Sequence, residues 1–539
     1  MNHPRCNPAG ARARSLGLFG LALALGAATA LPAELRLSRA DYVDRVHAIW
    51  AGQIIAVLVA MPYEHKTASV LPLETRPMLW RGKPATCAPV DDDWYYEMSA
   101  IRAFERHGIG LTVQQLGEQW LADRCGSWGS SEQARLNLER GIKAPDCGHP
   151  RYNKLWFTLG PQFSSDVYGA LAPGRPNVAG RMAREFGHIN GYAEGTDGAV
   201  FTATMISLAF AEHDSRAVVR RALTMLDPSS PYRQCIELVV TLAEAGRSFE
   251  QVVNAVEDRW HIEYPATNNA VANGGIVAAG LWFGGGQFWP TVNLIARAAD
   301  FTDADCNAAN AASVIGAMHG LKALPASLVA QLDDHIRGTG MGSVKEFPAP
   351  VDESISGLAR RTVMIGEKIL LAAGARGIAG ELLIPPEPIV TQPAELFALG
   401  DLMRYWNPDW TLERAGHGGA GGGMAGIRGI THLAGDVLAT YPRDEVRGCL
   451  LRRTARIAPG QRLRFEAASD PGRAWELDVY ADHTLLEKRV VVGDADGWRK
   501  FDLDLKAFAG RDVTLRLYQR VLVPNRTAGN ALWRNLRLE

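Results

Sequence analysis

The hydrophobic period of this chain changes once along its length, and that change constrains the fold more than any single motif. From residue 37 to about 412, apolar residues recur three and four positions apart, a spacing that predicts helices. The clearest runs cover residues 42–59, 98–104, 200–210, 218–226, 235–245, 271–282, 292–299 and 308–318. Few alternating runs occur here. We therefore expect an all-α domain over residues 37–412.

After about residue 443 the period becomes two, which is typical of half-buried strands. Apolar and polar residues alternate over 463–467, 475–480, 501–505, 513–518 and 533–538. Short strands of this kind predict a small all-β sandwich or jelly roll over residues 443–539. Trp475 and Trp533 lie within these strands, so core packing is favoured over sugar binding for both; Trp498 is a third candidate sugar platform.

A glycine-rich segment at residues 413–442 is expected to connect the two domains. It contains Gly416-x-Gly418-x-x-Gly421, which formally matches a dinucleotide fingerprint. No strand-like run precedes the motif, and no convincing second strand carries an acidic residue at the required distance. A linker or loop is therefore favoured over a nucleotide site.

The N-terminus predicts export. Arg5, Arg12 and Arg14 precede an apolar run over residues 16–29, and Ala28-Thr29-Ala30 offers a small-x-small cleavage site. We expect residues 1–30 to be a signal peptide. The mature protein should then be periplasmic or secreted, with no stable membrane span after cleavage. An uncleaved N-terminal anchor is the alternative.

Cysteine usage and net charge limit which metal sites, disulfides and partners the sequence can predict. Of seven cysteines, one lies in the signal segment, and no C-x-x-C spacing occurs, which excludes a zinc site of that type. The most plausible disulfide joins Cys125 to Cys147, which flank one loop-rich segment. The net charge is −1, so nothing indicates a nucleic-acid partner.

Two acidic clusters, far apart in the sequence, each begin an expected helix. They are Asp91-Asp92-Asp93 and Asp303-Ala304-Asp305-Cys306-Asn307. Aspartate at a helix start commonly caps free N–H groups, and either cluster alone is more simply explained that way. Brought together, they would supply hard oxygen ligands suited to Mg²⁺ or Mn²⁺. A third acid, Glu64, follows Pro62, which is expected to end the first helix.

These three elements occur in the order seen in the ADP-ribosylglycohydrolase family, which the chain resembles over roughly residues 40–380. Weaker motifs between them also resemble its larger branch; they begin at Ser131, Gly160, Pro173 and Gly198. The family's first cluster is usually Thr-Asp-Asp-Thr, so either Asp91 or Val90 stands at the first Thr position. Cys306 stands where Thr often follows the second pair.

The resemblance implies an orthogonal all-helical domain with a binuclear Mg²⁺ or Mn²⁺ centre that cleaves a glycosidic bond at an anomeric carbon. It implies that the metal ligands are Asp91, Asp92, Asp93, Asp303 and Asp305. It also implies catalytic roles for Glu64 and Asp92, and substrate contacts for His188, Asn190 and Asp166. For His188, a buried or loop histidine without substrate contact is an equal alternative. Because a thiol is a poor ligand for a hard ion, Cys306 leaves one of the two metals weaker or held by main-chain oxygen.

An exported enzyme would rarely meet cytosolic ADP-ribosylation, so we expect a small-molecule or glycan substrate: an ADP-ribosyl conjugate, a furanoside or another glycoconjugate. The alternative is a non-catalytic protein that binds a glycan or nucleotide sugar on a degenerate helical domain. That alternative predicts loss of the acidic ligands or of Glu64, and all of them are present.

Overall fold

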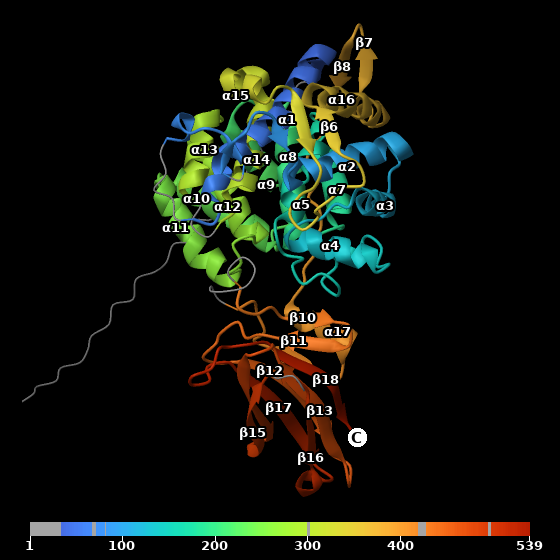
Figure 1. Ribbon diagram of the computed structural model, residues 1–539, viewed down its shortest axis with the longest axis vertical. Helices are drawn as coiled ribbons and strands as arrows, with labels where there is room; N and C mark the ends of the chain where they lie inside the picture. The colour runs from blue at the N-terminus through green and yellow to red at the C-terminus, as the bar shows by residue number, and fades with distance from the viewer. Residues whose placement is uncertain (1–33, 67–71, 81, 299–301, 419–426, 494–496) are drawn as a thin grey trace, which may run out of the picture.

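The computed structural model describes residues 34–66, 72–80, 82–298, 302–418, 427–493 and 497–539. It has a helical domain and a β-sandwich that lie end to end (Figure 1). The helices of the first domain are α1 (Arg39–Ala60), α2 (Asp92–His107), α3 (Val113–Asp123), α4 (Gly129–Glu139), α5 (Gly160–Phe163), α6 (Asp166–Ala170), α7 (Pro176–Gly187), α8 (Glu194–Ala209), α9 (Ser215–Leu223), α10 (Pro231–Glu244), α11 (Phe249–Val256), α12 (Ala270–Gly284), α13 (Phe288–Arg297), α14 (Ala304–His319), α15 (Ala326–Gln331) and α16 (Ile355–Ala372). The expected all-α domain is confirmed.

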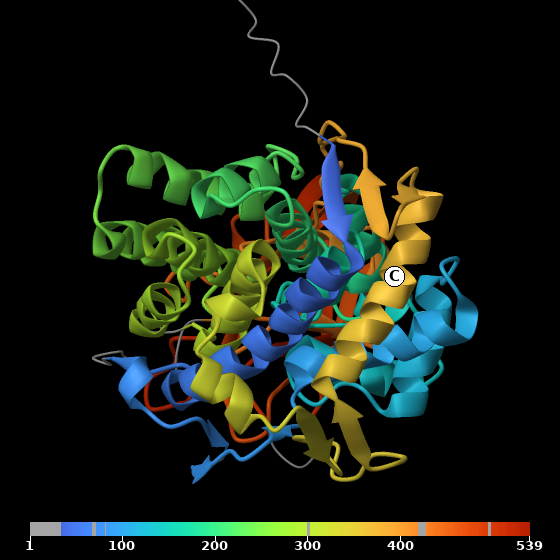
Figure 2. The ribbon, with the colours of Figure 1, turned by 90° about the horizontal axis from the view of Figure 1, so that it is seen from above.

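Helix α1 forms the centre of this domain. Seen from above, it crosses the middle of the helices, with α16 alongside it (Figure 2). Every residue from Ala48 to Ala60 is buried, so the helix is apolar on all sides rather than on one face. The segment Arg39–Tyr63 is long and apolar enough to cross a membrane, but 78% of its most apolar window is buried inside the protein. Its hydrophobicity is accounted for by core packing.

Helix α14 packs directly along α1. At the crossing, a Cβ added to Gly316 would lie 2.7 Å from the backbone carbon and oxygen of Ala48. Glycine is therefore what allows the two backbones to approach this closely. The packing fixes the N-terminus of α14, which carries Asp303 and Asp305, relative to the C-terminal end of α1, which leads to Glu64.

Short strands lie at the edges of the helical domain. One sheet has the order β1 (Leu35–Ser38), β8 (Glu381–Ile384) and β7 (Arg376–Ile378). A second consists of β4 (Ala88–Pro89), β5 (His335–Gly338) and β6 (Val351–Ser354), and a third pairs β2 (Leu79–Trp80) with β3 (Lys83–Pro84). Because β4 leads into α2, its pairing with β5 helps fix where Asp91 stands.

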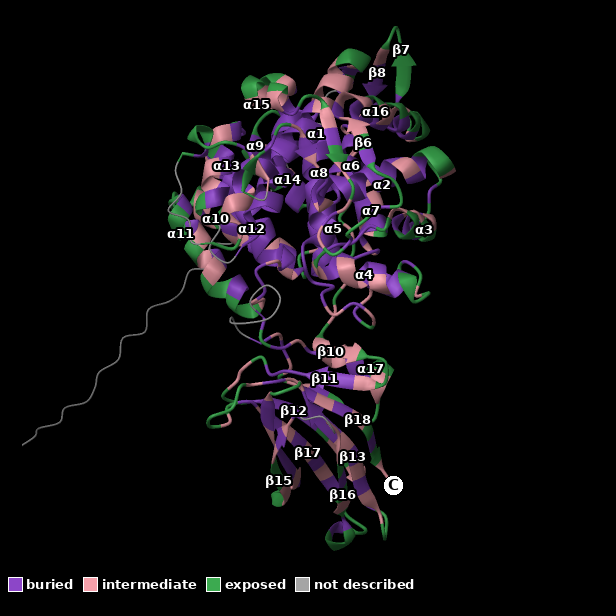
Figure 3. Cartoon of the chain, in the orientation of Figure 1, coloured by how far each residue is buried: buried purple, intermediate pink, exposed green. Residues whose placement is uncertain are grey.

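The second domain is a sandwich of two antiparallel sheets with a shared apolar interior (Figure 3). The strand orders are β10-β11-β18-β13-β16 and β15-β14-β17-β12-β9. The strands are β9 (Thr411–Glu413), β10 (His432–Ala434), β11 (Val437–Thr440), β12 (Cys449–Arg456), β13 (Arg462–Ser469), β14 (Ala474–Ala481), β15 (Thr484–Val492), β16 (Arg499–Asp504), β17 (Asp512–Arg520) and β18 (Ala531–Leu538). Trp475 and Trp533 are buried core residues, as expected.

Two expectations are corrected. Strands β9, β10 and β11 belong to the sandwich, so it begins near residue 411 and not at 443, and the described part of 413–442 is not a free linker. These strands are short and glycine-flanked, which hid their period.

Cys125 and Cys147 are both buried and unbridged, so the expected disulfide is corrected. The Cys147 thiol donates to the carbonyl of Ile189 at 3.1 Å. The expected signal peptide lies outside the described residues.

A carboxylate-lined cavity as the candidate active site

Two helix N-termini carry the acidic clusters. Asp91 directly precedes α2 with an extended φ of −133°, and Asp92 and Asp93 are in the first turn of that helix. Asp303 caps α14 by accepting a hydrogen bond from the Cys306 backbone N–H at 3.3 Å. Free N–H groups at helix starts stabilise nearby carboxylates. The backbone therefore favours negative charge at both places.

Glu64 reaches the same region from the end of α1. Pro62 lies in η1 (Met61–Tyr63), the short turn that ends α1, and Glu64 follows it. The chain then turns sharply at His65, which has a φ of 54° and donates its backbone N–H to the Thr302 carbonyl at 3.0 Å. This bond ties the Glu64 loop to the residue before Asp303, so the two acidic elements are held together through the backbone.

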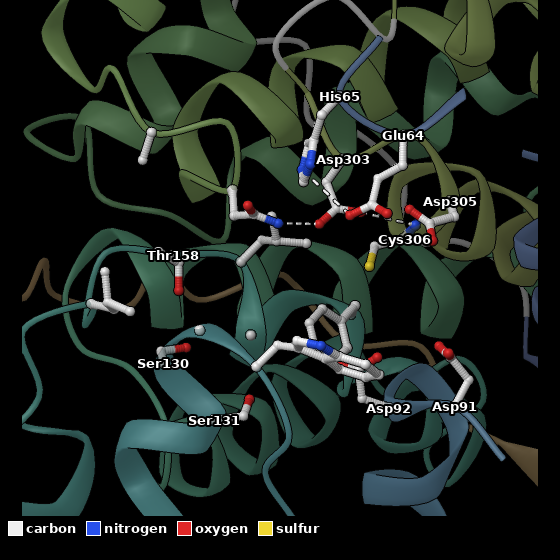
Figure 4. A pocket seen from close by; sticks show the side chains of 18 of the residues that line it. Glu64, His65, Asp91, Asp92, Ser130, Ser131, Thr158, Asp303, Asp305 and Cys306 are labelled. Atoms are coloured by element: carbon white, nitrogen blue, oxygen red, sulfur yellow. Dashed lines mark hydrogen bonds and ion pairs between the residues drawn. The ribbon is translucent and has the colours of Figure 1, made fainter. Parts of the chain in front are cut away.

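The acidic side chains meet in one cavity of about 350 Å³. Figure 4 shows Asp91 and Asp92 lying across a gap from Glu64, Asp303 and Asp305. The remaining polar lining comes from His65, Ser130, Ser131, Thr158, Asn268 and Cys306. The apolar lining comes from Met61, Trp80, Trp128, Leu155, Leu159, Phe163, Ala266 and Ile427. The cavity thus combines an acidic wall with a large apolar and aromatic surface.

The spacing of the acidic groups suits cation binding. One set consists of Glu64, His65 and Asp303; a second of Asp303, Asp305 and Cys306; a third of Asp91, Asp92 and Asp93. Within each set, one possible ligand atom per residue lies within 4.8 Å of the others. Asp303 belongs to two of the sets, so its carboxylate is the group that these two sets share.

The electrostatics of the cavity point the same way. Burial, followed by the charges of Asp305 and Asp91, raises the pKa of Glu64 to about 8. Burial, followed by the charge of Glu64, raises the pKa of Asp303 to about 6, and burial raises that of Asp91 to about 6. The pKa of Asp305 also lies well above its usual value, first because of burial and then because of Asp303. Bound cations would relieve this repulsion.

An unpartnered carboxylate oxygen in the cavity indicates whether a metal ion fits there. Within the described part of the chain, Oδ1 of Asp305, a residue that lines the cavity, is buried without a hydrogen-bond partner. A buried acceptor without a donor is costly, and a cation would satisfy it. Carboxylate oxygens are also the donors that Mg²⁺ and Mn²⁺ prefer. The residues present therefore fit a hard divalent ion.

Asp93 and Cys306 lie at the edge of this arrangement. Asp93 is buried and does not line the cavity, and its Oδ2 accepts a weak hydrogen bond from the Cys306 thiol at 3.4 Å. Burial, followed by the charges of Asp303 and Asp93, raises the pKa of Cys306 well above its usual value. The thiol is therefore neutral and acts as a donor to Asp93. Asp91 and Asp92 are the members of the first cluster that face the cavity.

The three residues expected to contact substrate do not line the cavity. His188 pairs with Glu395 at 2.8 Å, on the segment that leads to the sandwich. Asn190 is buried and donates to the Ser131 hydroxyl at 2.9 Å, so it positions a lining residue rather than a ligand. Asp166 is also buried and accepts a hydrogen bond from Asn310 at 2.8 Å. Sequence alone does not distinguish residues that support a wall from residues that form it.

Asp166 belongs to a buried polar network behind the cavity. The Gln162 amide donates to Asn310 at 3.2 Å, and the Tyr232 hydroxyl donates to Gln162 at 2.9 Å. Burial raises the pKa of Asp166 to about 7. The network joins α5, α6, α10 and α14, so Gln162 and Asp166 of the Gly160-x-Gln162-x-x-x-Asp166 motif are held behind the cavity.

Among the described lining residues that the sequence did not indicate are His65 and Asn268, which contact the acidic side chains. Nε2 of His65 lies 3.4 Å from Oε1 of Glu64, and the side-chain amide of Asn268 donates a short hydrogen bond to Asp303. His65 directly follows Glu64 in the sequence, and this adjacency was the available signal. No local sequence signal marked Asn268, because the loop before α12 reaches Asp303 only in the folded domain.

The helical domain thus holds a cavity at which two acidic helix starts meet. A family model described as ADP-ribosylglycohydrolase matches residues 38–365. The chain belongs to this family, whose members hydrolyse glycosidic bonds. The resemblance seen in the sequence is thereby confirmed.

Solved structures similar to each domain are distant. One titled "ADP-ribosylglycohydrolase-related protein complex" is 15% identical, with a TM-score of 0.41, and the match covers 60% of this chain and 97% of that one. One titled "CBM4 structure and function" is 13% identical, with a TM-score of 0.18, covering 25% and 88%. A mutant of a family 29 carbohydrate-binding module is 14% identical, with a TM-score of 0.15, covering 24% and 89%. No curated protein matches the chain.

Proposed function

We propose that this protein is an exported hydrolase, dependent on Mg²⁺ or Mn²⁺, that cleaves a glycosidic bond at an anomeric carbon. The observation that carries the proposal is the meeting of Glu64, Asp91, Asp92, Asp303 and Asp305 around one cavity. Metal ions bound there would act as Lewis acids and lower the pKa of a bound water. The remaining chemistry falls to the residues of the chain.

Asp91, Asp92, Asp303 and Asp305 would hold two ions and, through them, the hydroxyls of the sugar. Asp303 would be one of the residues that hold them, and Asn268 orients its carboxylate by donating a hydrogen bond to it. Asp92, facing the cavity from the first turn of α2, would also accept a hydrogen bond from the attacking water. Cys306 stays neutral and holds Asp93, so main-chain or water oxygens would complete the coordination.

Glu64 would transfer the proton. It follows the end of α1 and belongs to one of the three acidic sets, where it can take a proton from the attacking water or give one to the leaving group. His65, 3.4 Å away, limits the orientations open to the Glu64 carboxylate. A group with a raised pKa is suited to exchanging protons near neutral pH.

The substrate we favour is an exported glycan, furanoside or other glycoconjugate, with an ADP-ribosyl conjugate as the second candidate. Support comes from the signal-like N-terminus and from the sandwich that follows the hydrolase domain. Export is tested by N-terminal sequencing of the mature protein, which should begin at residue 31. Retention of residues 1–30 in a membrane-bound form would contradict it.

Activity is tested by product analysis with a panel of ADP-ribosylated and furanoside-bearing substrates, each with Mg²⁺, Mn²⁺ or a chelator. We expect release of a free sugar that requires the metal. Binding of the same compounds without turnover, whatever the metal, would instead support the non-catalytic alternative.

A further inference from the structure

The glycine-rich segment singled out in the sequence extends from the sandwich to the cavity of the helical domain. Its described residues form the base of a hairpin: His417 and Ile430 form an antiparallel bridge, and the backbone N–H of Gly418 donates to the Gly429 carbonyl at 2.8 Å. A Cβ on either glycine would overlap the ring of Tyr441. The glycines therefore serve close packing within the sandwich, not phosphate binding.

The hairpin base packs against the helical domain through aromatic and apolar contacts. The ring of His417 stacks on Phe157 with 4.2 Å between centroids and 25° between planes. Phe397, on the segment entering the sandwich, packs against Trp156 with 5.4 Å between centroids. Ile427 is 4% exposed and belongs to a cluster with Leu155, Trp156, Phe157, Ala193 and Ala266. The contact combines ring stacking with a buried apolar cluster, as in a domain core.

Ile427 also lines the cavity that holds the acidic centre, beside Leu155 and Ala266 of the helical domain. Among the described residues of the sandwich domain, Ile427 is the one that lines this cavity. Trp128, 43% exposed, lines the same cavity, and its indole is packed against Gly342, where an added Cβ would lie 2.5 Å from Cζ2. An apolar and aromatic surface thus adjoins the acidic centre.

We propose that Ile427, with Leu155, Ala266 and Trp128, forms a subsite for the leaving group, shaped for a flat apolar face such as an aryl ring or the C–H face of a second sugar. The sandwich is then part of the active site and not a separate module. The term leaving group rests on the proposed glycosidase function. The apolar binding surface does not, and the experiment below separates the two.

The test compares Ile427→Ala and Ile427→Asp with wild type in the full-length protein. Val446→Ala, at a sandwich side chain that is 75% exposed, is the matched control. The probes are aryl and methyl glycosides of one furanose. Binding is measured by calorimetry and turnover by product release. A thermal melt confirms that each variant is folded. If Ile427→Asp is not folded, the test rests on Ile427→Ala.

We expect Ile427→Ala to raise KM and Kd for the aryl glycoside about tenfold, the scale for losing contacts in an apolar pocket. The methyl glycoside should change by less than about twofold, and kcat should be retained for both. Intrinsic differences between the leaving groups cancel, because each variant is compared with wild type on the same compound.

The outcomes are distinct. Aryl binding that depends on Ile427 without any turnover would support the subsite and contradict the glycosidase function. Turnover with equal effects on aryl and methyl compounds, or with no effect of either Ile427 variant, would overturn the subsite and leave the function standing. A wild-type protein that binds no aryl glycoside would overturn the subsite as well.

Discussion

Replacing Asp303 by asparagine should separate folding from metal binding. Asp303 caps α14 and accepts a hydrogen bond from Asn268. Asparagine keeps an oxygen for the cap, and asparagine and aspartate are nearly equivalent N-caps. The amide nitrogen of the new side chain would face Asn268, whose side-chain amide can turn over to accept a hydrogen bond from it. The substitution therefore removes one charge with little change to the helix start. Since Asp303 belongs to two of the three sets of possible ligands, metal binding should suffer most.

The magnitude follows from the spacing. Two carboxylates within 4.8 Å repel by about 3.5 kcal/mol at an effective dielectric constant of about 20. Protonation of neighbouring acids already relieves part of this, so we expect the metal-free variant to be about 1 to 3 kcal/mol more stable than wild type at pH 7. Metal at about 100 times its Kd would stabilise wild type by about 2.7 kcal/mol, a Tm rise of about 2 to 4 °C for a cooperative unit of this size. The variant should lose that rise.

The pH dependence has a definite sign. The pKa values of Asp91 and Asp303 are raised to about 6 in the folded protein, so in the unfolded chain these groups ionise at lower pH. Their contribution to the stability of the metal-free protein is greatest below pH 4 and is lost as the pH rises through 6. With Mg²⁺ present, the loss should disappear in wild type.

The assay is a thermal melt across pH 5 to 8 with chelator or Mg²⁺, run beside turnover. Asp214→Asn is the control, because Asp214 caps α9 through the Arg216 N–H at 2.9 Å in an exposed position. It should leave the metal response intact. An Asp303→Asn variant that keeps the wild-type metal response and turnover would refute the shared metal centre.

Three other substitutions test separate parts of the structure. Glu64→Gln should lower kcat about 10² to 10⁴-fold in a turnover assay while the metal-dependent Tm rise persists, because a proton-transfer group is lost but the aspartates remain. In urea titrations below pH 6, wild type should lose up to about 1.4 kcal/mol of unfolding free energy per pH unit. The reason is that burial, followed by the nearby His432, lowers the pKa of His417 to about 3. His417→Phe should not show this loss. Gly316→Ala should destabilise the protein by about 1 to 3 kcal/mol in the same titration, since its Cβ would strike the Ala48 backbone.

Each of these has a result that would count against it. A Glu64→Gln enzyme within tenfold of wild type would remove Glu64 from proton transfer. Equal acid sensitivity of wild type and His417→Phe would mean that His417 is not held neutral at the domain contact. Gly377→Ala is the control for Gly316→Ala, because no atom lies within 4 Å of its added Cβ. An equal cost at both glycines would argue against close helix packing.

Much of the fold follows from local patterns. Apolar spacing located α1 and the core of α14, and the change of period located the sandwich, since side-chain periodicity reports which face of an element is buried. The patterns failed where elements are short or where neighbours decide. Strands β9, β10 and β11 carry too few residues to show a period, and Cys125 and Cys147 lie in one loop-rich region without meeting.

By itself, the sequence determined the two domains, the helix starts that carry Asp91 and Asp303, and the turn that presents Glu64. All of these depend on residues close together in the chain. Only the tertiary structure decided that Asp92 faces the cavity while Asp93 turns away to Cys306, that Asp166 and Asn190 support the wall, and that Ile427 of the sandwich completes it. Those choices depend on the packing of elements far apart in the sequence, such as α1 with α14 and the hairpin base with Phe157. The spacing of apolar residues within one segment does not indicate which distant segment packs against it.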